Sequence, residues 1–197
     1  YSPAPCVTEE IYRQAMENII LPTVRGMAED GIRYTGFLYA GLMISQGKDG
    51  APVVRTLEFN CRFGDPETQP IMMRMKSDFS ELVEAAIEGK LDEKTVEWDP
   101  RTALGVVCAA RGYPTRPEKG AVIEALPEDN AETHVFHAGT ALDDEGLTIV
   151  SGGRVLCVVG LGDTVKAAQE RAYEAAHQVK FDGMQMRSDI GYRAIGR

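Results

Sequence analysis

The residues best suited to chemistry stand close together in the first third of the chain. Glu58, Asn60 and Arg62 alternate along a stretch that reads as a β-strand, and alternate residues of a strand share one face. A carboxylate and an amide oxygen suit Mg²⁺, which takes few protein ligands and completes its shell with phosphate and water. An arginine one step further could clamp a phosphoryl or acyl-phosphate oxygen. The alternative is an ordinary half-exposed strand with its polar side chains outward.

A turn rich in charged residues follows directly. It holds Arg62, Asp65 and Glu67 among glycine and proline, and it is flanked by Phe63 and by the apolar residues 70–72. Charged residues in one turn are usually solvated. The apolar flanks instead predict that this turn is partly buried, and buried charges need partners or ligands.

Residues 57–69, Leu-Glu-Phe-Asn-Cys-Arg-Phe-Gly-Asp-Pro-Glu-Thr-Gln, resemble the signature of the phosphoribosylamine–glycine ligase family, also called glycinamide ribonucleotide synthetase. The Arg-Phe-Gly-Asp-Pro-Glu core is the specific part of the resemblance. Further segments that resemble the family are 1–5, 34–43, 151–157 and 187–195. The resemblance covers essentially the whole chain.

This resemblance implies an ATP-grasp ligase of de novo purine biosynthesis. Such enzymes join 5-phosphoribosylamine and glycine through glycyl phosphate, using ATP with Mg²⁺ or Mn²⁺. By the family pattern, Glu58 and Asn60 are the metal ligands at the nucleotide, and Leu57 packs near the adenine. Arg62 faces the transferring phosphoryl group.

The resemblance places Asp65 and Glu67 at the substrate end, with orienting and proton-accepting roles open for both. It also implies that this chain is the C-terminal half of the enzyme. The upstream half, which holds the nucleotide from the other side, is therefore an expected partner, and the chain alone is expected to be inactive. Many grasp enzymes place another acidic ligand on the preceding strand, but residues 37–44 contain no acid, so the metal stoichiometry stays open.

A hairpin must position these residues. Residues 36–44 are apolar on both sides, which predicts a buried strand. Residues 53–59 predict the antiparallel return strand, after a turn with Asp49 and Gly50 at its tip.

Helices are predicted on both sides of the hairpin in sequence. The first covers residues 8–30, is capped by Thr8, and is kinked or divided at Pro22. The second begins after Asp78, which forms a capping box with Glu81, and it ends at Gly89.

The polar stretch after Gly89 predicts a domain boundary. Residues 1–88 would be the C-terminal part of an ATP-grasp domain, and residues 89–197 a small strand-rich α+β domain. Strands are predicted at 103–110, 121–125, 133–138, 147–150 and 155–160, followed by a helix over 164–180. Asp163 is the expected N-cap of that helix.

Composition excludes several classes of protein. The chain has 197 residues and a formal net charge of −9, which disfavours non-specific binding to nucleic acid or anionic membrane. No apolar run reaches the roughly 18 residues of a transmembrane helix, and the first residues lack the features of a signal peptide. The four cysteines have no zinc-site spacing, which favours reduced thiols and a cytoplasmic protein.

Other functions stay open beside this one. The same grasp chemistry could act on a different carboxylate or amine, or the chain could be a non-catalytic fragment that binds a companion chain. A separate signal, Gly160-Leu-Gly-Asp-Thr, is similar to a dinucleotide-binding loop, but Val165 stands where a third glycine is needed. A simple turn with a helix N-cap is favoured there.

Overall fold

The computed structural model describes residues 1–196, which form two compact units. Unit 1 comprises residues 1–3, 66–76 and 98–196, and unit 2 comprises residues 4–65 and 77–97. Both units combine helices with strands, as the α+β prediction requires. The domain boundary expected after residue 88 stays a prediction.

Unit 2 is built on the predicted hairpin. Strand β1 (Tyr39–Gln46) pairs antiparallel with β2 (Pro52–Asn60). At the tip, Gly50 has a φ of +81° and the Ala51 N–H donates to Asp49 Oδ1 over 3.1 Å. The expectation of a buried first strand is wrong, because β1 is only half-buried along most of its length and Met43 is 51% exposed. Within the described residues this sheet has only two strands, which leaves much of its surface open.

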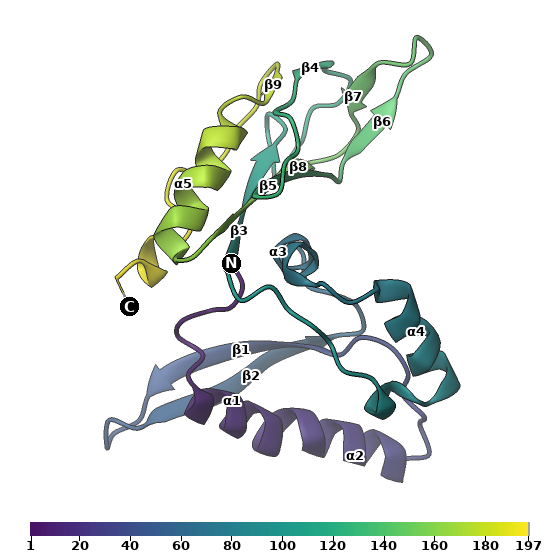
Figure 1. The fold of residues 1–197 in the computed structure, drawn as a ribbon, viewed down its shortest axis with the longest axis vertical. Helices are drawn as coiled ribbons and strands as arrows, with labels where there is room; N and C mark the ends of the chain where they lie inside the picture. Colours follow the sequence, from purple (N-terminus) through teal and green to yellow (C-terminus); the bar gives the residue numbers. More distant parts are fainter. Residues whose placement is uncertain (197) are drawn as a thin grey trace. The chain divides into compact units, whose positions relative to one another are not determined.

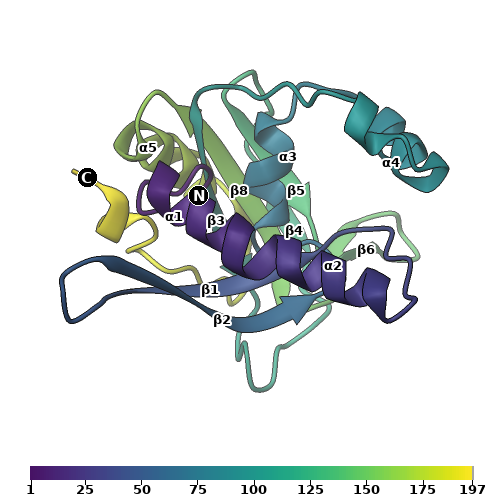
Figure 2. The ribbon, with the colours of Figure 1, turned by 90° about the horizontal axis from the view of Figure 1, so that it is seen from below.

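The first helix is divided at the position that proline predicts. Helix α1 (Glu9–Ala15) passes through a π-helical turn (Met16–Ile20) into α2 (Leu21–Glu29). Pro22 follows directly after the π-helical turn. Because it lacks the N–H that would bond to the preceding turn of this continuous helical run, it accounts for the distortion of the helix there. Thr8 caps α1 as expected. Figure 1 and Figure 2 both show α1 and α2 running in line along one side of the hairpin.

Helix α4 (Phe79–Glu88) begins and ends at the residues that the sequence predicts. The Asp78 carboxylate accepts hydrogen bonds from the backbone N–H groups of Ser80 and Glu81. Gly89 ends the helix in the left-handed conformation, with a φ of +73°. A short 3₁₀ helix (Leu91–Glu93) follows.

Unit 1 is a sheet with a helix on each face. Strand β8 (Arg154–Gly162) lies between β3 (Thr102–Ala109) and β5 (Thr133–His137), and both pairs are antiparallel. Helix α5 (Val165–Ala176) packs on one face and α3 (Thr68–Arg74) on the other (Figure 1). The smaller elements are β4 (Ile123–Ala125) with β9 (Lys180–Phe181), β6 (Thr140–Leu142) with β7 (Thr148–Val150), and a 3₁₀ helix (Tyr192–Ala194).

Two apolar layers hold this sheet between its helices. On the α5 side, fully buried β3 and β8 residues such as Leu104, Leu156 and Val158 meet the alanine face of the helix, which includes Ala168 and Ala172. On the α3 side, a second cluster of buried residues packs against Met73; its members are Ala103, Cys157, Val159 and Leu161. Burial of this kind contributes about 25 cal/mol per Å² of apolar surface.

Three details of unit 1 differ from the sequence predictions. Helix α3 was not predicted, because seven residues are too few to show a helical period and Pro70 stands inside them. Strands β6 and β9 were also missed, and each has only two or three residues. The N-cap of α5 is Thr164, whose side chain accepts from the Ala167 N–H, and not Asp163. No helix in residues 1–196 is both long enough and apolar enough to cross a bilayer.

A network of ion pairs and hydrogen bonds holds the segment just before β3 against α3. Asp99 is 8% exposed, and its carboxylate accepts from both the backbone and the guanidinium of Arg101, with a shortest distance of 2.7 Å. Arg74 of α3 donates to the carbonyls of Asp99 and Arg101 and to Ser2 Oγ. The hydrogen bonds from Arg101 lower the pKa of Asp99 from 3.8 to about 2.

This network makes part of the stability depend on pH. Because the folded pKa of Asp99 is depressed, its contribution is complete above about pH 4 and is lost as the pH falls towards 2. We expect Asp99→Asn to lower the free energy of unfolding by about 1–2 kcal/mol at pH 7 and to flatten the stability curve between pH 4 and pH 2. Fluorescence of Trp98, the only tryptophan, reports on this region. Asp182→Asn, at an exposed ion pair with Arg111, is the control and should cost under about 0.5 kcal/mol.

Candidate functional site

The two predicted metal ligands lie together at the end of β2. Asn60 Nδ2 donates to Glu58 Oε1 over 3.3 Å, so the carboxylate and the amide share one face of the strand. Across the hairpin, Glu58 pairs with Gly41 and Asn60 with Tyr39. A Cβ at Gly41 would stand 3.2 Å from Glu58 Cγ. The glycine therefore leaves the space in which the Glu58 side chain lies.

Leu57 stands at an irregularity of the hairpin. The register passes from Glu58, opposite Gly41, directly to Thr56, opposite Leu42, which leaves Leu57 without a cross-strand partner. Its side chain is 65% exposed. Bulges bend a strand and re-aim its side chains, so this apolar side chain is presented beside Glu58 and not packed in the hairpin.

An aromatic cluster anchors the turn after β2. The Phe63 ring stacks on Phe37 with a centroid distance of 4.1 Å, and both rings neighbour Phe79 of α4. Arg62 donates from Nη1 to the Phe63 carbonyl over 2.8 Å, which orients the guanidinium locally. The expectation of a partly buried turn holds for Phe63 and Gly64 but is wrong for the charged side chains, because the aromatic cluster shields only the apolar side of the turn.

The predicted site residues are divided between the two units. Leu57, Glu58, Asn60, Arg62 and Asp65 belong to unit 2, and the change to unit 1 falls between Asp65 and Pro66. Glu67 is the N-cap residue of α3 and belongs to unit 1, where it lines a cavity of about 780 Å³.

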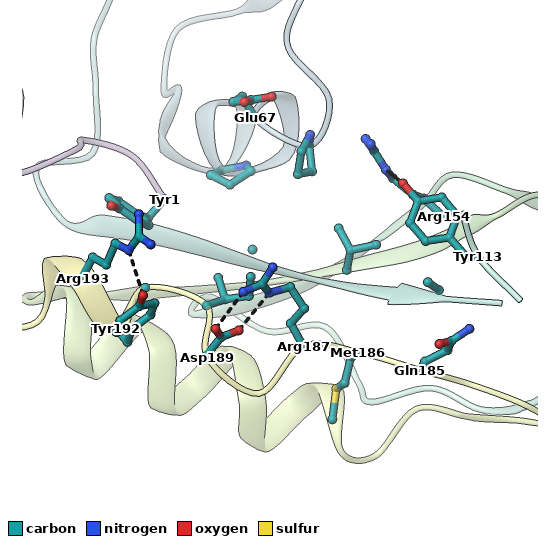
Figure 3. Close-up of a pocket in the computed structure, with 17 residues that line it drawn as sticks. Tyr1, Glu67, Tyr113, Arg154, Gln185, Met186, Arg187, Asp189, Tyr192 and Arg193 are labelled. Atoms are coloured by element: carbon teal, nitrogen blue, oxygen red, sulfur yellow. Dashed lines mark hydrogen bonds and ion pairs between the residues drawn. The ribbon is translucent and has the colours of Figure 1, made fainter. Parts of the chain in front are cut away.

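That cavity lies on the α3 side of the unit 1 sheet (Figure 3). Alternate residues of β3, namely Gly105, Val107 and Ala109, line it, while the intervening residues face the core under α5. Gly105 has to lack a side chain, because a Cβ there would stand 3.2 Å from Pro70 Cγ and 2.9 Å from Cys157 Sγ. A cavity of this size is typical of a small-molecule site.

Three arginines line the cavity, and a neighbour holds each of them. Arg154 Nε donates to the Tyr113 hydroxyl over 2.7 Å. Arg187 donates from Nε and Nη2 to the two oxygens of Asp189, over 2.8 and 2.7 Å, and it lowers the pKa of that carboxyl. The third is Arg193, whose Nε donates to Tyr192 Oη over 2.8 Å.

Sequence reasoning missed these arginines as site residues. They lie in the segments 151–157 and 187–195, which resemble the family as whole stretches. Neither segment has a spacing that indicates a chemistry by itself. The fold brings both segments to one cavity with Glu67. The two-residue period of a strand, in contrast, predicts from the sequence alone that Glu58 and Asn60 lie on one face.

The residues present fit a magnesium ion with few protein ligands. Within residues 1–196, no three side chains of His, Cys, Asp or Glu gather into a cluster that could hold a metal. Glu58 and Asn60 instead offer one carboxylate and one amide on an exposed face. Mg²⁺ is bound in this way when phosphate and water complete its octahedral shell.

Comparison with known proteins decides the family. Two family models match, "Phosphoribosylglycinamide synthetase, ATP-grasp (A) domain" over residues 1–68 and "Phosphoribosylglycinamide synthetase, C domain" over residues 103–193. A protein of Ralstonia nicotianae named phosphoribosylamine–glycine ligase is 61% identical over 197 residues, which is 100% of this chain and 46% of the relative. The chain belongs to the phosphoribosylglycinamide synthetase family.

Solved structures agree with this family and with its fold. The crystal structure of phosphoribosylamine–glycine ligase from Thermotoga maritima superposes with a TM-score of 0.76 at 41% identity, over 90% of this chain and 42% of that one. The biotin carboxylase domain of the Hydrogenobacter thermophilus 2-oxoglutarate carboxylase superposes with a TM-score of 0.64 at 13% identity, over 94% of this chain and 39% of that one. This second likeness concerns the fold alone. The chain spans about half the length of the curated phosphoribosylglycinamide synthetase relatives it matches.

Proposed function

We propose that this chain belongs to an ATP-dependent ligase that joins 5-phosphoribosylamine and glycine to give glycinamide ribonucleotide, ADP and phosphate. One observation carries the proposal: Asn60 Nδ2 lies 3.3 Å from Glu58 Oε1 on the strand that leads into the Arg62-to-Glu67 turn. In a family whose named members are phosphoribosylamine–glycine ligases, this is the arrangement expected for Mg-ATP. The activity is proposed for a protein of the relatives' full length, together with the upstream half.

The proposed roles follow the order of the residues along the chain. Glu58 and Asn60 hold Mg²⁺ (or Mn²⁺), which neutralises phosphate charge when it is bound. Arg62 donates to the transferring phosphoryl group, and Leu57 packs near the adenine. The glycine carboxylate takes the γ-phosphoryl group of ATP, which gives glycyl phosphate and releases ADP. The amine then attacks the carbonyl carbon and loses a proton as phosphate leaves.

Asp65 and Glu67 are proposed at the amine end of the reaction. A carboxylate there can orient the amino group of phosphoribosylamine or accept its proton as the C–N bond forms. The exposed position of both side chains suits contact with a small-molecule substrate. None of the four cysteines, Cys6, Cys61, Cys108 and Cys157, forms a disulfide bond, which supports the cytoplasm as the proposed location.

Omission of single substrates tests the function. ADP release is measured for the full-length protein with Mg-ATP, glycine and phosphoribosylamine, and each is left out in turn. Release that requires both glycine and the amine supports the ligase. Release with another carboxylate or amine would favour a grasp ligase of other specificity. A folded protein that releases no ADP would overturn the proposal.

Gly41 gives a second test, through the space beside Glu58. A valine there would push against Glu58 Cγ, which stands 3.2 Å from the position of a Cβ. We expect Gly41→Val to lower Mg-ATP turnover by about tenfold, because misplacement of a ligand by a fraction of an ångström weakens the electrostatic stabilisation of the reacting phosphate. Met43→Val, at an exposed position of the same strand, is the control. Equal activity of the two variants would show that Gly41 does not position Glu58.

A further inference from the structure

The segment between α2 and β1 is closed by the side chain of a tyrosine. The Tyr34 hydroxyl donates a hydrogen bond to the Phe37 carbonyl oxygen over 2.6 Å. Gly36 lies between them with a φ of +137°, a conformation that residues with a side chain rarely adopt. Residues 34–37 therefore form one fixed turn, the Tyr34 turn. Strand β1 begins two residues later, where Tyr39 pairs with Asn60 of β2.

The same hydroxyl joins the Tyr34 turn to the end of β2. It shares a hydrogen bond with the Cys61 thiol, and this contact raises the pKa of Tyr34 above its usual value. Because the single hydroxyl proton is donated to the Phe37 carbonyl, the thiol is the donor in this second bond. Cys61 stands between Asn60 and Arg62. The hydroxyl thus contacts the residue that separates a proposed metal ligand from the proposed phosphoryl-binding arginine.

A second side chain of the Tyr34 turn holds the next residue but one. The Phe37 ring stacks on the Phe63 ring with a centroid distance of 4.1 Å, and Phe79 lies 5.9 and 6.1 Å from the two rings. Aromatic pairs of this kind are favourable beyond the area that they bury. Arg62 in turn donates to the Phe63 carbonyl over 2.8 Å. The position of Phe63 therefore also sets where the Arg62 guanidinium begins.

We propose that Tyr34 is a positioning residue for Asn60 and Arg62. The inference rests on the proposed ligase function, in which Asn60 is a metal ligand and Arg62 meets the transferring phosphoryl group. The Tyr34 turn contacts Cys61 and Phe63, which alternate in sequence with these two residues. It thereby fixes the backbone from which the amide and the guanidinium extend. Small errors of position are costly where preorganised groups must meet a phosphate, and Tyr34 acts through its neighbours.

Binding of Mn²⁺ together with ADP is the first test, because it needs neither glycine nor the amine. Electron paramagnetic resonance of Mn²⁺ with ADP and the full-length protein gives the affinity for the ion and reports on its ligand geometry. Tyr34→Phe removes only the hydroxyl and is expected to weaken Mn²⁺ binding about three- to tenfold and to change the spectrum of the bound ion.

Tyr12→Phe is the matched control, since Tyr12 is 60% exposed on α1 of the same unit. It should leave the affinity and the spectrum unchanged. Both variants should melt within about 2 °C of the wild type, because the hydrogen bond of Tyr34 lies at the surface. A lower melting temperature of Tyr34→Phe with an unchanged Mn²⁺ spectrum would show a structural role only and would overturn the inference.

Kinetics separate this inference from the ligase function. In an active protein, Tyr34→Phe should lower kcat about tenfold and leave the KM values for glycine and the amine unchanged. Cys61→Ala should lower kcat about threefold in the wild type and have no further effect in Tyr34→Phe, because the two side chains share one contact. Unchanged Mn²⁺ binding and an unchanged kcat in Tyr34→Phe, with an active wild-type protein, would overturn the positioning role alone. Tyr34-dependent Mn²⁺ binding by a protein that releases no ADP with glycine and the amine would support that role and overturn the ligase.

Discussion

Glu58→Gln in the full-length protein is expected to lower kcat/KM for Mg-ATP by about a thousandfold or more. The substitution keeps the size of the side chain and removes the charge that the proposed Mg²⁺ requires. Preorganised charge at a reacting phosphate is worth several kcal/mol, and Asn60 supplies only a neutral oxygen. Higher Mg²⁺ concentrations should recover only a small part of the loss.

The fold should survive this substitution. Glu58 is exposed, and its side chain accepts a hydrogen bond from Asn60 that a glutamine oxygen can also accept, so the melting temperature should move by no more than about 2 °C. Glu84→Gln, on an exposed position of α4 in the same unit, is the matched control and should keep full activity. If Glu58→Gln turned over Mg-ATP within tenfold of the control, Glu58 would not be a metal ligand.

Local chemistry explains what the sequence predicts well. Thr8, Asp78 and Gly89 each act on backbone groups within one helical turn, so their effect does not depend on the rest of the chain. The same holds for the hairpin tip at Gly50. The pairing of Glu58 with Asn60 follows from the two-residue period of a strand, which no tertiary contact has to supply.

The features that were missed depend on contacts between distant residues. Helix α3 is short and contains Pro70, and it is held by contacts with β3 and β8 and by the hydrogen bonds of Arg74. The arginine-lined cavity joins residues of α3, β3, β8 and the C-terminal segment. No residue spacing along the chain predicts that these four segments come together. The prediction that the first hairpin strand is buried was wrong for a related reason, because the apolar composition of a strand does not say which other elements cover it.

The glycines at 160 and 162 are required by the packing of a helix on the sheet and not by a local motif. Both lie inside β8, where α5 crosses the strand at close range. A Cβ on Gly160 would stand 2.6 Å from the Ala168 carbonyl oxygen, and one on Gly162 would stand 2.4 Å from the Ala168 nitrogen. These glycines admit the helix backbone to the sheet. They belong to the strand and not to the simple turn that was favoured over a dinucleotide loop, and the N-cap that follows them is Thr164.

Gly162→Ala is therefore expected to lower the free energy of unfolding by about 3 kcal/mol, a large effect for one added methyl group. The clash is with backbone atoms at the start of α5, which cannot rotate away as a flexible side chain would. Either the helix shifts and loosens the alanine contacts at Ala168 and Ala172, or the strand bends and its pairing with β3 weakens. Urea unfolding followed by Trp98 fluorescence measures the loss.

Gly26→Ala provides the opposite case for the same chemical change. Gly26 lies in α2, and a Cβ added there would meet no atom within 4 Å, so alanine should stabilise the helix by about 0.5–1 kcal/mol. Circular dichroism during thermal unfolding records this gain.

A loss of less than about 0.5 kcal/mol for Gly162→Ala would mean that α5 and β8 tolerate a wider separation. In that case the core under α5, and not the close approach of the two backbones, would set the position of the helix.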